Sequence, residues 1–229
     1  MDLLDDFINL IFPRICPCCG NSLWKHEKVI CTFCDFHLPK TGFHLDKENP
    51  VTFTFYGRVR IESGAAFYYF NKGNRAQKLV HQLKYKGRKD IGVFLGEKYG
   101  ILLRQSSHFE TIDLILPVPL HKKKRMQRGY NQSEEFAKGL SATMKVPFDP
   151  YALYRCKATE TQTRKSRYKR WQNVEEMFAV KESAQLEGKH LLLVDDVITT
   201  GATLESCIQT LINIPGVKVS VAAIAYTRH

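Results

Sequence analysis

The chain has 229 residues, of which 44% are hydrophobic and 25% are charged, and its formal net charge is +11. This is the composition of a globular protein, and it excludes disordered, collagen-like and low-complexity classes. No apolar run approaches the roughly 20 residues that a membrane-spanning helix needs. The first dozen residues are apolar and acidic, without the basic start of a secretory signal. We therefore expect a cytoplasmic protein with no stable membrane insertion. Its excess positive charge indicates a polyanionic partner such as nucleic acid, a nucleotide or a phosphorylated metabolite.

The first segment predicts a short amphipathic helix ahead of Pro13. Leu3, Leu4, Phe7 and Ile8 share one helical face. Because the segment is acidic, we expect it to dock on the next domain and not on a membrane.

Five of the seven cysteines fall between residues 16 and 34. Cys16 with Cys19 and Cys31 with Cys34 form two CxxC pairs separated by 11 residues. Two such pairs complete a tetrahedral four-cysteine zinc site, which would be structural because no ligand position is left open. Cys18 is the alternative to Cys16, and a redox CxxC is the alternative use of a pair. The odd, clustered count does not fit an extracellular disulfide framework and favours a metal site in a reducing cytosol.

The middle of the chain predicts a strand at 61–70 and two helices, at 75–85 and 91–104, from apolar residues at helical spacing. An α/β rhythm follows. Apolar runs at 112–118, 190–194 and 217–226 alternate with helical patterns at 131–144 and 203–212. Buried parallel strands read as continuous apolar runs, and their alternation with helices implies crossover connections. The sequence therefore predicts a parallel sheet flanked by helices.

A basic segment follows the predicted strand at 112–118. Five cations lie in the seven residues 122–128, just before a helix that Asn131 is placed to cap. We interpret this segment as a turn that forms a second anion site, in which Arg128 suits bidentate contact with phosphate. For residues 122–124 individually, a solvated surface is the interpretation we prefer.

A second basic segment, residues 157–173, is polar and irregular in pattern. Five of its cations interleave with Tyr168 and Trp171. It could be a mobile hood that closes over a ligand and excludes water. It could instead bind nucleic acid, with cations on phosphates and aromatic rings stacked on bases. A solvated helix with Trp171 packed on the core is the third interpretation.

The strongest motif is LLLVDDVITTGATL at residues 191–204. An apolar strand runs into two acids, and a short Thr/Gly loop then leads into a helix. Backbone N–H groups at such a helix start favour a phosphate, and Gly201 permits close backbone approach. Asp195 and Asp196 suit sugar hydroxyls or Mg²⁺. The motif therefore predicts a ligand with a phosphate, a vicinal diol and a metal, against the simpler alternative of a strand–loop–helix with a Thr cap.

This motif resembles the signature with which type I phosphoribosyltransferases bind 5-phosphoribosyl 1-pyrophosphate (PRPP). The resemblance implies that Asp195 and Asp196, the predicted catalytic residues, face the ribose hydroxyls of Mg²⁺–PRPP. The 5′-phosphate would lie on Val197, Ile198, Thr199, Thr200, Gly201, Ala202 and Thr203. The pyrophosphate and other anionic groups would lie on Pro119, Leu120, His121, Arg128, Arg167 and Arg170.

Over nearly the whole chain, the sequence resembles the ComF family of late-competence proteins. The motifs that carry the resemblance are FP before CPCC, CTFC, LKYKG, PVPLHKKKRMQRGYNQ, QTRKSRYKRWQNVEEMF and LLLVDDVITTGATL. It implies a four-cysteine zinc-ribbon-like module at 1–45 and a type I phosphoribosyltransferase-like α/β domain at 46–229, with the hood at about 157–173. It also implies a role in handling single-stranded DNA during natural transformation, with a competence helicase as a further partner.

Two classes of function remain open. The first is a Mg²⁺–PRPP-dependent transferase or sensor, which includes a nucleotide-salvage phosphoribosyltransferase with no DNA role. The second is a DNA-binding module with a vestigial PRPP site. The candidate nucleic-acid contacts are Lys84, Lys122, Lys123, Arg125, Tyr168 and Trp171.

Overall fold

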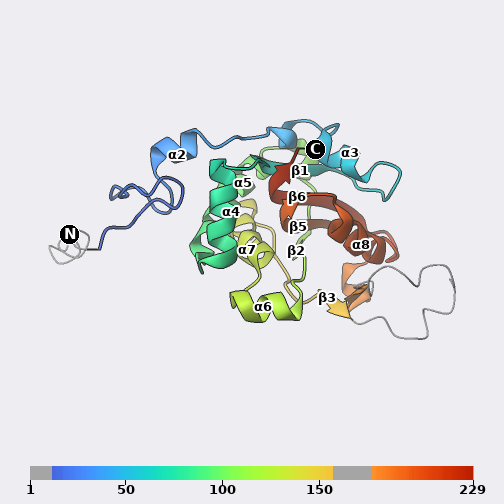
Figure 1. Ribbon diagram of the computed structural model, residues 1–229. Helices are drawn as coiled ribbons and strands as arrows, with labels where there is room; N and C mark the ends of the chain where they lie inside the picture. The colour runs from blue at the N-terminus through green and yellow to red at the C-terminus, as the bar shows by residue number, and fades with distance from the viewer. Residues whose placement is uncertain (1–11, 157–176, 229) are drawn as a thin grey trace.

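The computed structural model describes residues 12–156 and 177–228, and Figure 1 shows their arrangement. The helices are α2 (Thr32–Phe36), α3 (Pro50–Phe55), α4 (Arg75–Tyr85), α5 (Lys89–Arg104), α6 (Lys122–Arg128), α7 (Gln132–Met144) and α8 (Ala202–Leu211). The strands are β1 (Gly64–Phe70), β2 (Leu114–Pro117), β3 (Leu153–Cys156), β4 (Met177–Val180), β5 (His190–Ile198) and β6 (Lys218–Thr227). The helix expected ahead of Pro13 and the hood expected at 157–173 lie outside the described residues. No helix in the described part of the chain is long and apolar enough to cross a bilayer.

A four-stranded sheet forms the centre of the molecule, in the order β1-β6-β5-β2. All its pairings are parallel, and one row of the register runs through Gly64, Val221, Leu193 and Leu116. Residues 191–194 of β5 and 221–223 of β6 have no exposed surface, as expected when both faces of a parallel sheet are covered. The predicted parallel sheet is therefore confirmed. Because the strands are parallel, their carboxyl ends meet along one edge.

Helices cover both faces of this sheet (Figure 1). The helices α4, α5 and α7 lie on one side, and α8 lies on the other. The helices α5 and α7 approach each other closely because small residues face each other. A Cβ atom added at Gly96 would lie 2.2 Å from the carbonyl oxygen of Phe136, and one added at Gly139 would lie 2.1 Å from that of Val93. Only glycine allows so close a contact between the two helices at these positions.

Two elements near the sheet edge differ from the sequence predictions. The strand β5 continues to Ile198, so Asp195 pairs with Ala223 of β6 within the strand and does not follow it. The basic segment expected as a turn is instead the helix α6. The ring nitrogen Nδ1 of His121 accepts a hydrogen bond from the N–H of Lys123 at 3.1 Å, and Gly129, with φ of 75°, ends the helix. Lysine, arginine, glutamine and methionine favour a helix between these two ends.

The strands β3 and β4 and the helix α3 were not predicted either. The strands β3 and β4 pair antiparallel on either side of the segment that lies outside the described residues. The helix α3 begins with Asn49 as its cap and Pro50 as its first residue, which is a sequence signal of a helix start.

Candidate functional site

The two CxxC pairs bring four cysteines together near the N-terminal end of the described chain. The Sγ atoms of Cys16, Cys19, Cys31 and Cys34 all lie within 4.8 Å of one another. Those of Cys19 and Cys31 are 3.7 Å apart. A tetrahedral site with metal–sulfur bonds of about 2.3 Å has sulfur–sulfur edges of about 3.8 Å. The four side chains therefore fit one metal ion.

Short local turns build this cluster. The N–H of Gly20 donates to the carbonyl of Cys16 at 2.9 Å and closes the first turn, while Sγ of Cys31 accepts from the N–H of Cys34 at 3.4 Å at the start of α2. Burial by itself raises the pKa of Cys16. The N–H groups of Cys31, Cys18 and Cys19 outweigh it and lower the pKa to about 7.

Cys18 lies outside the group of four. Its Sγ faces the carbonyl of Arg75 at 3.9 Å, and burial raises its pKa to about 12. The ammonium of Lys78 in α4 donates to the carbonyl of Cys18 at 3.0 Å, and Lys98 of α5 forms an ion pair with Asp35. The cysteine-bearing segment is therefore fastened to α4 and α5 by residues that are not metal ligands.

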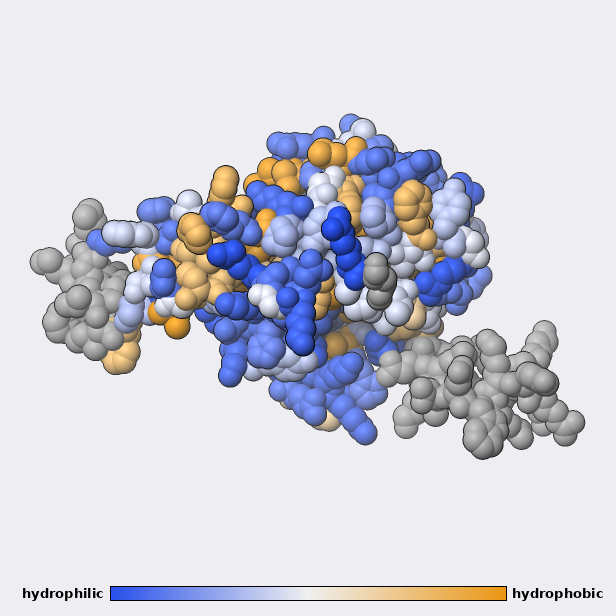
Figure 2. All heavy atoms as spheres, turned by 45° about the horizontal axis from the view of Figure 1, so that its top comes forward, coloured by the Kyte–Doolittle hydropathy of each residue, from blue (hydrophilic) through white to orange (hydrophobic). Residues whose placement is uncertain are grey.

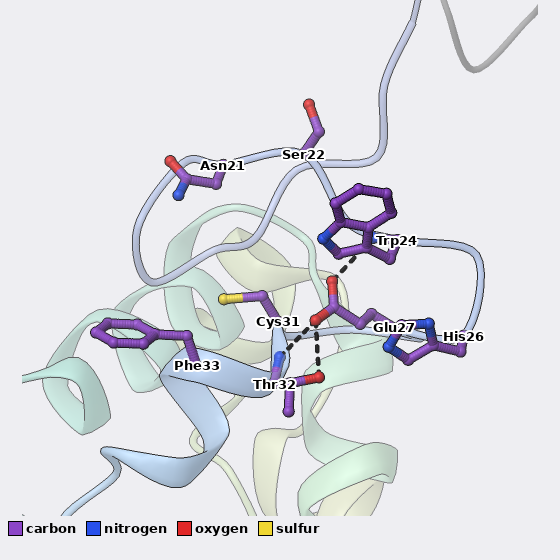
Figure 3. A pocket seen from close by; sticks show the side chains of 8 residues that line it. All are labelled: Asn21, Ser22, Trp24, His26, Glu27, Cys31, Thr32 and Phe33. Atoms are coloured by element: carbon purple, nitrogen blue, oxygen red, sulfur yellow. Dashed lines mark hydrogen bonds between the residues drawn. The ribbon is translucent and has the colours of Figure 1, made fainter.

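A pocket of about 380 Å³ lies beside the cysteines (Figure 3). Its lining residues are Asn21, Ser22, Trp24, His26, Glu27, Cys31, Thr32 and Phe33. The carboxylate of Glu27 accepts hydrogen bonds from the N–H groups of Trp24 and Thr32 and from the Thr32 hydroxyl, at 2.8, 2.6 and 2.9 Å. These N–H donors lower the pKa of Glu27. Figure 2 shows hydrophobic side chains gathered over this end of the molecule, where Trp24 and Phe33 are exposed.

A second site lies at the carboxyl edge of the sheet, around the two acids of β5. Oδ1 of Asp195 accepts hydrogen bonds from the hydroxyl of Ser133 at 2.9 Å and from the N–H of Asp196 at 2.8 Å. The ammonium of Lys84 lies 2.9 Å from Oδ1 of Asp196. Burial, with the adjacent charge of Asp196, raises the pKa of Asp195 to about 7. The first turn of α7 and the end of α4 thus converge on the acids.

The loop after these acids leads into α8. Thr199 and Thr200 are exposed, and Gly201 occupies the cap position with φ of 76°. Gly201 offers the helix no side-chain cap, and the hydroxyl of Thr200 accepts only a long hydrogen bond, 3.4 Å, from the N–H of Ala202. A Cβ atom at Gly201 would lie 2.9 Å from Cγ2 of Thr54. The loop therefore presents hydroxyls and backbone N–H groups next to the acids, an arrangement that favours an anion.

Arg58 holds this loop in place and was missed by the sequence reasoning. Its Nη1 donates to the carbonyls of Thr200 at 2.9 Å and Thr54 at 3.1 Å, and its Nη2 forms an ion pair with Glu205. No local pattern around Arg58 indicates this role, because its partners in the loop and in α8 lie more than 140 residues away along the chain.

The loop after β2 lies beside the acids because β2 pairs with β5. The side-chain amide of Asn131 donates to the carbonyl of Val118 at 2.9 Å, and its oxygen caps α7, as predicted. Nε of Arg155 donates to the carbonyl of Pro119 at 2.7 Å, and its guanidinium lies 4.7 Å from the ring centroid of Phe178. Burial lowers the pKa of Arg155. Arg155, like Ser133, was not singled out from the sequence.

The remaining predicted residues lie in different surroundings. Arg128 is half-buried, with its guanidinium 5.2 Å from the ring centroid of Tyr85 and hydrogen-bonded to Gln132 at 2.7 Å. Lys122, Lys123 and Arg125 lie exposed on α6, and His121 and Leu120 lie just before it. Lys84 forms an ion pair with Asp196. The predicted residues Arg167, Tyr168, Arg170 and Trp171 lie outside the described residues. The roles assigned to all of these side chains remain predictions.

Comparison with known proteins relates the second half of the chain to a known domain. Residues 131–229 match the sequence model of the phosphoribosyl transferase domain. The fold is therefore that of a phosphoribosyltransferase-like protein.

Three curated proteins show similarity over longer stretches. The DNA utilization protein YhgH of Escherichia coli (strain K12) is 33% identical over 137 residues, covering 58% of this chain and 60% of the relative. Competence protein F of Haemophilus influenzae is 32% identical over 130 residues, covering 55% and 57%. Competence protein ComFC of Bacillus subtilis (strain 168) is 25% identical over 206 residues, covering 87% and 78%. The chain is therefore similar to ComF-type proteins that carry a phosphoribosyltransferase-like domain, although its match spans only about 60% of the length of the first of these relatives.

Proposed function

We propose that this protein binds Mg²⁺–PRPP at the carboxyl edge of its sheet. The observation that carries the proposal is the placing of two adjacent acids, Asp195 and Asp196, directly before an exposed Thr/Gly loop at the start of α8. On this proposal, the backbone N–H groups and hydroxyls of residues 197–203 hold the 5′-phosphate. The carboxylates accept hydrogen bonds from the ribose hydroxyls. The loop at 119–121 and Arg128 then face the pyrophosphate.

The chain's own part in a transfer reaction is to position the ligand and to balance its charge. A nucleophile of an acceptor attacks C1 of the ribose, and the bond from C1 to the pyrophosphate oxygen breaks. Pyrophosphate leaves with the electron pair of that bond. Mg²⁺, when bound with PRPP, supplies positive charge that stabilises the leaving group.

The metal held by the N-terminal cysteines is, on this proposal, zinc. Four thiolates at tetrahedral spacing are the donor set of structural zinc sites, and all four positions are filled by protein ligands. We propose that residues 1–45 form this zinc module and residues 46–229 form the phosphoribosyltransferase-like domain.

A second function, binding of single-stranded DNA, is favoured by α6. This helix has no buried residue and carries five of the chain's cations, including Lys122, Lys123 and Arg125. Cations on an exposed helix bind phosphates through charge and without base sequence. Relatives named for DNA utilization and competence support this function. On this proposal, the protein handles DNA during natural transformation, with a helicase as a further partner.

Isothermal titration calorimetry with Mg²⁺–PRPP tests the first function. We expect wild type to bind and the variants D195N and D196N to lose most of their affinity. The control E187Q, which removes the charge of an exposed acid ahead of β5, should bind like wild type. Absence of PRPP binding by the wild type would overturn the proposal.

Fluorescence anisotropy with short single-stranded DNA tests the second function. Affinity should fall steeply between low and high salt, because binding releases counterions. The triple variant K122Q/K123Q/R125Q should show a flatter salt dependence than wild type, whereas D196N should match wild type. A salt-independent affinity, or an unchanged slope in the triple variant, contradicts DNA binding by α6.

A further inference from the structure

Lys84 forms a close ion pair with one of the acids of β5. It lies in the last turn of α4, and its Nζ is 2.9 Å from Oδ1 of Asp196. The Lys84 side chain is 21% exposed and that of Asp196 is 13% exposed. An ion pair this sheltered is only weakly screened by salt. Lys84 therefore belongs to the carboxyl edge of the sheet and not to the open surface.

The two neighbouring acids are satisfied in different ways. Asp195 accepts hydrogen bonds from neutral donors, the hydroxyl of Ser133 and the N–H of Asp196. Asp196 has the charged partner. Within residues 12–156 and 177–228, the ion pair between Lys84 and Asp196 is the only one that involves either acid. The ammonium thus balances a negative charge at the place where a ligand would offer its hydroxyls.

The end of α4 is also tied to the segment that leads into α7. The hydroxyl of Tyr130 donates to the carbonyl of Leu83, and the guanidinium of Arg128 lies 5.2 Å from the ring centroid of Tyr85. Lys84 lies between these two contact residues in sequence. The end of α4 and the segment before α7 therefore pack together, and they carry the ammonium of Lys84 and the guanidinium of Arg128.

We propose that Lys84 is a binding residue for the pyrophosphate of PRPP, held by Asp196 until the ligand arrives. This inference rests on the proposed function. When ribose hydroxyls donate to Asp196, the carboxylate no longer depends on Lys84 for its hydrogen bond. The flexible four-carbon chain of lysine then allows the ammonium to reach a nearby phosphate oxygen, where a charge-assisted hydrogen bond forms.

Comparison of two ligands separates this role from a merely structural one. PRPP carries the pyrophosphate, and ribose 5-phosphate lacks it. A charge-assisted hydrogen bond changes affinity by roughly 10- to 100-fold. We expect K84M to weaken PRPP binding by that factor and to change the affinity for ribose 5-phosphate by less than about threefold. K84R, which keeps the charge, should retain most of the PRPP affinity.

The control is K86M, which removes an equal charge from an exposed lysine two residues away, and it should bind both ligands like wild type. Calorimetry measures all arms, and thermal denaturation checks folding. If K84M does not fold, K84Q, which keeps a donor for Asp196, carries the same comparison. If K84M leaves the PRPP affinity unchanged, or weakens binding of both ligands equally, the role of Lys84 is overturned and the proposed function still stands. If wild type binds no PRPP, the proposed function fails and the role of Lys84 fails with it.

Discussion

The cysteine cluster is built from residues close together in the sequence, whereas the carboxyl edge of the sheet is built from residues far apart. The four cysteines lie within residues 16–34, and short turns set their geometry. The edge instead combines Lys84, Ser133 and Asp195, which come from α4, α7 and β5. On the proposed function, a metal bound by the four cysteines stabilises their segment, whereas the edge residues lie at the end of a buried sheet. Loss of one ligand should therefore disrupt the whole module, and loss of one edge residue should have a graded effect.

The largest effect is expected from removing one cysteine ligand. Structural zinc sites bind with about 10 kcal/mol or more, so C34S should lose its metal and leave the cysteine-bearing segment open to protease. C18S, which alters a cysteine outside the group of four, should keep a full equivalent of metal. Elemental analysis of purified protein and limited proteolysis measure both. Metal retained in C34S, or lost in C18S, would contradict the assignment of ligands.

A smaller effect concerns the pH dependence of the edge. The pKa of Asp195 is raised to about 7 in the folded protein, against about 3.9 for an unperturbed aspartate. The folded state then holds the proton more tightly, so the stability contributed by Asp195 is full below about pH 4 and is lost as the pH rises through about 7. We expect wild type to lose roughly 4 kcal/mol relative to D195N between pH 4 and pH 8.

Urea denaturation of wild type and D195N at these two pH values measures this difference. A stability difference that does not change with pH would show that Asp195 titrates normally. The same raised pKa predicts that PRPP binding tightens as the pH rises towards 8, because the carboxylate form accepts the ribose hydroxyls.

The smallest effect is expected at the loop before α8. Arg58 bonds two carbonyls and Glu205 near the surface, so R58A should lower the free energy of unfolding by about 1 kcal/mol. PRPP affinity should fall by only about threefold, because the loop loses hydrogen bonds that hold it in place and loses no contact with the ligand. The matched control is R60A, because the Arg60 side chain is 88% exposed with a distant partner at 3.7 Å. If R58A and R60A had equal effects on stability and on PRPP binding, Arg58 would not be the residue that holds the loop before α8 in place.

Much of the fold was predictable because its signals are local. The helix at 75–85 and the strands near 190 and 217 follow from apolar spacing, and the structure has α4, β5 and β6 at these places. Asn131 was predictable as a cap because capping involves the next two or three residues. The helix α6 was missed because its basic composition was interpreted as a solvated turn, although His121 and Gly129 mark its two ends.

The sequence by itself determined the parallel sheet, the paired cysteines, and the acids followed by a Thr/Gly loop, because each depends on neighbours in the chain. Only the tertiary structure decided the strand order, the close packing of Gly96 on α7, and the contacts of Lys84, Ser133 and Arg58. These contacts join residues dozens of positions or more apart. They form because the crossover helices bring the ends of different elements to one edge of the sheet, which no local pattern specifies.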